Sequence, residues 1–96
     1  MPRYLIVRAF DVDQQEMPDV GRRSRELIEG EFPAITWEHS HVVVDDSGAV
    51  RTYCVYDGPD EDTIRQHASR LGKHNLEVLA EIAGDVSPAD FPPVPH

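Results

Sequence analysis

The feature that most constrains this fold is a predicted β-hairpin in the middle of the sequence. Residues 35–45 and 50–56 are rich in β-branched and aromatic side chains, and the turn-forming run Asp45-Asp46-Ser47-Gly48 separates them. Two such runs on either side of a short turn are typical of adjacent antiparallel strands. The sequence therefore predicts a hairpin whose first arm carries Trp37 and whose second arm ends at Tyr56.

Further elements are predicted on both sides of the hairpin. Residues 4–10 form a nearly continuous apolar run, which indicates a strand that is covered on both faces. Apolar residues at helical spacing predict a helix over residues 18–29, with Gly30 as a left-handed C-cap. A second helix is expected from about residue 59 to Gly72, with carboxylates in its first turn, and a last strand over residues 76–82.

The order β-α-β-β-α-β is that of the ferredoxin-like split βαβ fold. We therefore expect an α+β domain over residues 1–84, with a four-stranded antiparallel sheet and both helices on one face. The remaining residues, 85–96, contain Ser87-Pro88 and Phe91-Pro92-Pro93-Val94-Pro95. Proline cannot donate a backbone hydrogen bond, so this Pro-rich segment is expected to be an extended tail.

Two helices cannot cover both faces of such a sheet, yet the first strand is apolar on both. Tyr4, Ile6 and Phe10 would line one face, and Leu5, Val7 and Ala9 would line the other. We therefore expect a second copy of the chain to cover the open face in a two-fold homodimer. The alternative is a face tolerated in water and made less apolar by Tyr4 and Arg8.

Composition limits the possible partners and compartment. The 96 residues carry 18 acidic and 9 basic side chains, a formal charge of −9, which argues against nucleic acid and anionic membrane surfaces as partners. Cys54 is the single cysteine, so no internal disulfide can form and a reducing, cytoplasmic setting is expected. No apolar stretch approaches the ~18 residues of a membrane span.

Histidines provide the strongest local signal. His39 and His41 lie two residues apart on a predicted strand, so their imidazoles should share one face and reach one metal ion. Imidazole suits nickel, copper, zinc and iron. Glu38 is predicted to point to the opposite face of the strand. His67, on the flank of the second helix, could point back towards the sheet.

Features that indicate an enzyme are missing from the sequence. It contains no nucleophile elbow, Gly-rich phosphate loop, His-Glu-x-x-His or Cys-x-x-Cys pattern. Cys54 lies mid-strand between Tyr53 and Val55 and is expected to be a small buried residue. The acidic run at residues 57–62 lacks the ligand spacing of a calcium loop and is better explained as a helix start. A non-enzymatic protein is therefore favoured.

The hairpin and second helix resemble a known family through three groups of residues: Trp37-x-His39-Ser40, Tyr53-Cys54-Val55-Tyr56, and Pro59-Asp60-Glu61 with Ile64-Arg65-x-His67-Ala68. The family consists of small bacterial proteins catalogued as a domain of unknown function, and it includes nickel-binding, nickel-responsive ferredoxin-like homodimers. The resemblance covers residues 1–82. It implies a metal-binding role and places His39 and His67 in the matching motif. His41 departs from the family pattern, which usually has an aromatic residue there.

Two functions are carried forward. The first is a cytoplasmic homodimer that binds nickel, or alternatively zinc or copper, through His39 and His41, with His67 or a partner-chain group completing the site. The family is also similar in fold to dimeric α+β barrel proteins, which include oxygenases and small-ligand binders. The second is therefore a dimer whose sheets enclose a cavity for a small organic ligand or an oxygenase-type reaction, walled by Tyr4, Trp37, Tyr53 and Tyr56. A third hypothesis is an interaction module that has neither the metal site nor the ligand cavity.

Overall fold

The computed structural model describes residues 1–95, and His96, the last residue of the predicted tail, lies outside the described residues. The strands and helices follow in the order β1 (Arg3–Phe10), α1 (Met17–Gly30), β2 (Thr36–Val44), β3 (Val50–Asp57), α2 (Glu61–Leu71) and β4 (His74–Glu81). Short 3₁₀ helices occupy Gln14–Glu16 and Pro88–Asp90. The predicted order β-α-β-β-α-β is confirmed.

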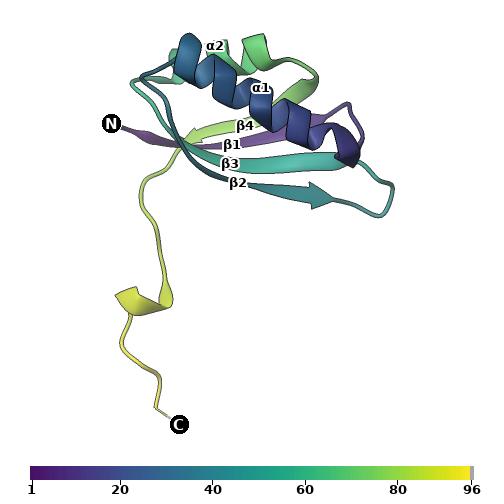
Figure 1. The fold of residues 1–96 in the computed structure, drawn as a ribbon. Helices are drawn as coiled ribbons and strands as arrows, with labels where there is room; N and C mark the ends of the chain where they lie inside the picture. Colours follow the sequence, from purple (N-terminus) through teal and green to yellow (C-terminus); the bar gives the residue numbers. More distant parts are fainter. Residues whose placement is uncertain (96) are drawn as a thin grey trace.

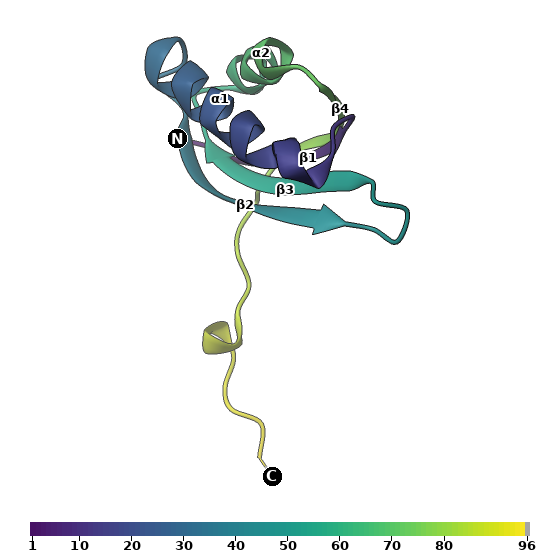
Figure 2. The same cartoon turned by 45° about the vertical axis from the view of Figure 1, so that its right-hand side comes forward.

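The four strands form one antiparallel sheet in the order β2-β3-β1-β4. Both helices pack on the same face of this sheet, and the opposite face is uncovered (Figures 1 and 2). This arrangement confirms the ferredoxin-like α+β fold. The first hairpin arm, β2, lies at one edge of the sheet, and β4 lies at the other.

The turn of the hairpin is held by the turn-forming residues that its sequence contains, Asp45 and Gly48. The Asp45 carboxylate accepts hydrogen bonds from the backbone N–H groups of Ser47, at 2.9 Å, and Ala49, at 3.1 Å. Gly48 has a φ of 87°, in the left-handed region that glycine adopts most easily. These contacts fix the pairing of β2 with β3, in which Val44 lies opposite Val50.

Local capping sets the ends of α2 but not of α1. The Asp60 carboxylate accepts a 2.8 Å hydrogen bond from the Thr63 N–H at the start of α2, and Gly72 ends the helix with a φ of 66°. The predicted left-handed cap at Gly30 is wrong. Helix α1 continues through Gly30, and the next residue, Glu31, caps it in the right-handed region.

The core lies between the helices and the covered face of the sheet. Strand residues that alternate along β1 and β3 meet the inward faces of α1 and α2. The buried apolar side chains form two clusters: Tyr4, Ile6, Ile28, Ile35, Cys54, Tyr56 and Ile64; and Phe10, Val20, Leu27, Val50 and Leu71.

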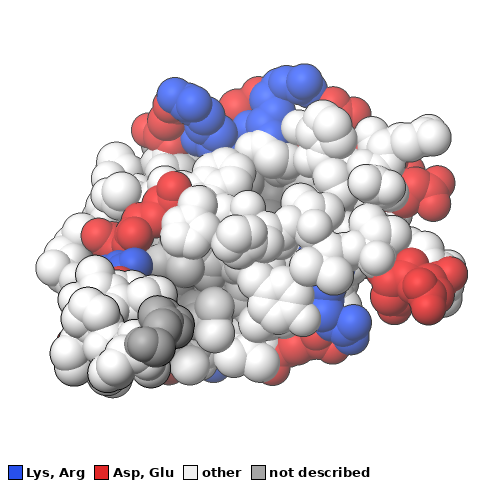
Figure 3. Space-filling view, turned by 90° about the horizontal axis from the view of Figure 1, so that it is seen from below, with Lys and Arg blue, Asp and Glu red and all other residues white. Residues whose placement is uncertain are grey.

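The uncovered face of the sheet, which we call the open face, carries few charges near its centre. Seen from below, its middle is formed by uncharged side chains, and most charged groups lie around its margin (Figure 3). Val43, Tyr53 and Val78 are 46%, 38% and 41% exposed there. Among residues 1–95, no helix is long and apolar enough to cross a membrane.

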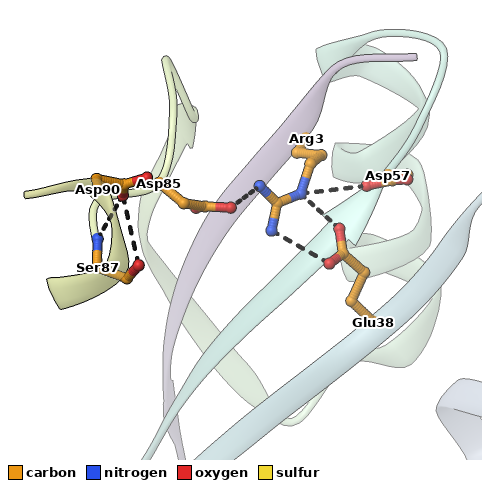
Figure 4. Close-up of polar contacts among 6 residues, drawn as sticks. All are labelled: Arg3, Glu38, Asp57, Asp85, Ser87 and Asp90. Carbon is orange, nitrogen blue, oxygen red and sulfur yellow. Dashed lines mark hydrogen bonds and ion pairs between the residues drawn. The ribbon is translucent and has the colours of Figure 1, made fainter.

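The segment after β4 extends away from the sheet, below the open face (Figures 1 and 2). Asp85 forms an ion pair with Arg3 of β1, and Ser87 and Asp90 bond to each other in a short capping box (Figure 4). The apolar side chains of this segment, Val86, Phe91 and Val94, are largely exposed.

Candidate functional site

His39 and His41 lie side by side on β2. They pair in register with Val55 and Tyr53 of β3, which places both imidazoles on the open face because directly opposed residues share a face. Their ring centroids are 5.3 Å apart, and both residues are exposed. The two-residue period of a strand thus places His39 and His41 on the same face, as the sequence predicts.

A β-bulge between Trp37 and His39 changes the direction of Glu38. Bulges insert one extra residue and re-aim the side chains next to it. The Glu38 carboxylate meets Arg3, at 2.7 Å, on the face that Arg3 shares with Asp57, its partner in register (Figure 4). Because His39 lies on that face too, the prediction that Glu38 points away from it is wrong.

Arg3 holds this group of acidic side chains together. Its hydrogen bonds lower the pKa of Glu38 below the usual value of a glutamate. The hydrogen bond and negative charge of Glu38, together with partial burial, raise the pKa of Asp57. The Glu38 carboxylate, which lies next to the histidine pair, is therefore already paired with the Arg3 guanidinium.

His67 lies on the other side of the sheet. Its side chain extends from α2 and is fully buried against α1 and the sheet. Its Nε2 lies 3.1 Å from the Ser24 hydroxyl oxygen, and its ring centroid lies 5.5 Å from that of Tyr56. Burial, followed by the charge of Arg8, lowers the pKa of His67 to about 4. Since the strands separate it from the open face, the structure does not bring His67 to His39 and His41.

The aromatic residues proposed as walls of an inter-sheet cavity divide between two faces. Tyr4, Trp37 and Tyr56 are paired in register and face the helices, with Tyr4 and Tyr56 buried in the core. Tyr53 lies on the open face. These four residues therefore do not line one cavity between stacked sheets.

Arg8 is the residue whose position the sequence analysis missed. The alternative to a dimer placed it, with Tyr4, on the face exposed to water. Instead, Tyr4, Ile6 and Arg8 lie at every second position of β1 and share the face under the helices, where Arg8 is only 2% exposed. Its Nη1 donates to the buried sulfur of Cys54 at 3.3 Å, and its guanidinium lies 5.3 Å from the centre of the Tyr56 ring. Strict alternation along β1 would have found it.

In residues 1–95, no three His, Cys, Asp or Glu side chains lie close enough together to hold a metal ion. Residues 4–82 match a family described as nickel responsive protein SCO4226-like. A search of curated proteins returns no match. The matched region contains the strands and helices of the sheet domain except Arg3, the first residue of β1, and it includes both predicted histidine positions on β2.

Proposed function

This chain belongs to the SCO4226-like family of nickel-responsive proteins, and from that premise we propose that it binds nickel(II) through His39 and His41 without catalysing a reaction. The observation that carries the proposal is the 5.3 Å separation of two exposed imidazole rings on one face of an edge strand. Imidazole nitrogen is a common ligand for nickel, and also for zinc and copper, which are the alternative metals.

A second copy of the chain completes this site in our proposal. On the open face, exposed Val43 and Tyr53 lie beside the histidines, and exposed Val78 lies on β4 at the other edge of the sheet. Burying these side chains against a two-fold-related copy would remove apolar surface from water. The partner would then add ligands to those that one chain supplies. We place this dimer in the cytoplasm, where the thiol of buried Cys54 stays reduced.

The exposed tail supports the choice of a second copy as the partner. Val86, Phe91 and Val94 are 77%, 61% and 73% exposed on a segment that extends below the open face (Figure 1). Such apolar side chains are available to pack on another molecule that occupies this side of the sheet. In the dimer, each tail would contact the neighbouring copy.

Calorimetric titration of tag-free protein with nickel chloride tests the metal site. Replacing both ligands, as His39→Gln with His41→Gln, should weaken nickel binding by more than the roughly tenfold to hundredfold that loss of a group supporting a ligand costs. The matched control is His74→Gln, because His74 lies on β4 and faces the helices. Equal nickel affinity in the double variant and the wild type would contradict the assignment of His39 and His41 as ligands. Zinc and copper titrations of the same proteins rank the metals.

A further inference from the structure

A cavity of about 460 Å³ lies on the helix side of the sheet, between α1 and the strands β2 and β3. Glu38 and His39 of the edge strand β2 are also among its lining residues, so the cavity reaches the strand that carries the histidine pair. Most of its wall is apolar and includes Phe10, Met17, Val20, Trp37 and Leu71. Its volume is within the range of about 300–1,000 Å³ that is typical of small-molecule sites.

Small residues on α1 create this space. Gly21 and Ser24 lie three positions apart on the helix and both line the cavity. A Cβ atom added at Gly21 would approach nothing closer than the Trp37 ring, at 4.0 Å. The cavity therefore exists because α1 presents a hydrogen atom and a hydroxymethyl group where larger side chains would fill it.

Arg8 lines this cavity as an uncompensated cation. The described residues place no carboxylate within ion-pair distance of it, and its Nε and Nη2 have no hydrogen-bond partner. Arginine keeps its proton in proteins, so it cannot relieve this burial by becoming neutral. Glu38 also lines the cavity, but its carboxylate is paired with Arg3 at 2.7 Å. Burial raises the pKa of Tyr56, which favours the neutral phenol, and lowers the pKa of His67 to about 4, which favours the neutral imidazole.

The unpartnered donors are arranged for a carboxylate. Nε and Nη2 lie on one edge of the planar guanidinium, the edge that forms two parallel hydrogen bonds to carboxylate oxygens. Thr52 lies opposite Arg8 in the sheet, lines the same cavity, and has a buried hydroxyl without a partner. All three atoms are buried, so the Arg8 and Thr52 side chains would have to turn towards the cavity. One anion would then satisfy three polar atoms that have no partner.

We propose that this cavity binds a small organic monocarboxylate, with its carboxylate on Arg8 and Thr52 and its apolar body against Phe10, Val20 and Trp37. Charge selects the carboxylate head, and the apolar wall selects a hydrocarbon or aromatic body over a short polar one. The chain's formal charge of −9 repels anions at long range, so selection depends on the local contact with Arg8.

Trp37 is the only tryptophan of the chain and lines the cavity, so its fluorescence reports binding directly. Titration of the full chain with octanoate should give a saturable change in that fluorescence. Acetate lacks the apolar body and 1-octanol lacks the charge. Each should therefore bind at least about tenfold more weakly than octanoate. No saturable octanoate signal, or equal affinity for octanoate and 1-octanol, overturns the proposal.

Two variants localise the site. Arg8→Met keeps an unbranched side chain of similar length and should reduce octanoate affinity by about tenfold or more. Gly21→Leu fills the cavity without changing any charge and should abolish binding. Its matched control is Gly30→Leu on the same helix, where an added side chain meets open space and binding should be unchanged. Wild-type affinity in both Arg8→Met and Gly21→Leu contradicts the assignment.

Discussion

The hydroxyl oxygen of Ser24 lies 3.1 Å from Nε2 of His67, and this contact joins α1 to α2 above the sheet. The same hydroxyl lies 3.3 Å from the phenol oxygen of Tyr56 on β3. Three polar side chains from three elements thus meet inside an apolar core, and all are buried. Because a charged imidazole there would also face the cation of Arg8, the structure favours neutral His67.

We predict that this buried histidine makes the protein less stable in mild acid. Folding lowers the pKa of His67 to about 4, whereas an unfolded histidine titrates near ~6.5. Between these values the unfolded chain binds more protons, so stability falls as the pH falls. The contribution of neutral His67 to the free energy of unfolding is fully present above about pH 6.5. It is lost as the pH falls to about 4, and the loss is up to about 3 kcal/mol. Urea unfolding across this range measures it.

His67→Leu provides the comparison for this prediction. Leucine cannot titrate and suits the apolar surroundings of Phe32 and Tyr56, so its free energy of unfolding should change less between about pH 7 and pH 4. The same substitution at exposed His41 should leave the pH dependence of the wild type in place. If His67→Leu loses as much stability in acid as the wild type, the buried imidazole is not the cause.

Arg8→Met should make the protein more stable. The guanidinium is buried with two unpartnered nitrogens, and each unsatisfied buried donor costs about 1–3 kcal/mol. Replacing buried charged groups by apolar ones of similar size commonly raises stability by about 1–4 kcal/mol. Thermal unfolding of the two proteins, without added carboxylates, measures the difference. A lower melting temperature for Arg8→Met would mean that the contacts with Cys54 and Tyr56 outweigh the cost of burial.

Gly58 is predicted to be intolerant of even a methyl group. A Cβ atom at this position would lie 2.9 Å from Cδ1 of Ile64, a side chain with no exposed surface. Since Ile64 cannot move into solvent, Gly58→Ala should destabilise the protein by about 1–3 kcal/mol through overpacking. Chemical denaturation gives the free energy of unfolding, and Gly30→Ala, where nothing lies within 4 Å, should be neutral or stabilising.

A second substitution tests whether this clash is the reason. Ile64→Val removes Cδ1 and alone should cost about 0.5–1.5 kcal/mol. In that background Gly58→Ala should cost less than it does in the wild type, so the double-mutant cycle should show a favourable coupling energy. Strictly additive effects would show that Gly58 is required for another reason.

Much of this fold follows from local sequence signals. Turn residues at Asp45–Gly48 and β-branched runs on both sides identify the hairpin, and Asp60 and Gly72 mark the ends of α2. The shared face of His39 and His41 follows from the two-residue period of a strand. Each of these features depends on residues close together in the chain, which is why sequence alone predicts them.

The rest depends on contacts between distant segments. Glu38 changes direction because of a bulge in β2 that alternation does not anticipate, and its carboxylate then meets Arg3, 35 positions away. His67 is correctly predicted on a helix, but whether that helix turns it towards the histidine pair depends on which face of the sheet α2 covers. The cavity beside Arg8 depends on the packing of α1 over the sheet.

The open face offers a sharp test of the proposed dimer, because two neighbouring valines of β2 point to opposite sides. Val43 pairs with Arg51 on the open face and Val42 pairs with Thr52 on the helix side, and they are similarly exposed, at 46% and 50%. Val43→Lys places an ammonium in the proposed interface, where desolvating an unpaired charge costs several kcal/mol. Light scattering over a concentration series should therefore show dissociation for Val43→Lys and a wild-type dimer for Val42→Lys. Equal dissociation of both variants, or a monomeric wild type, would contradict an interface on this face.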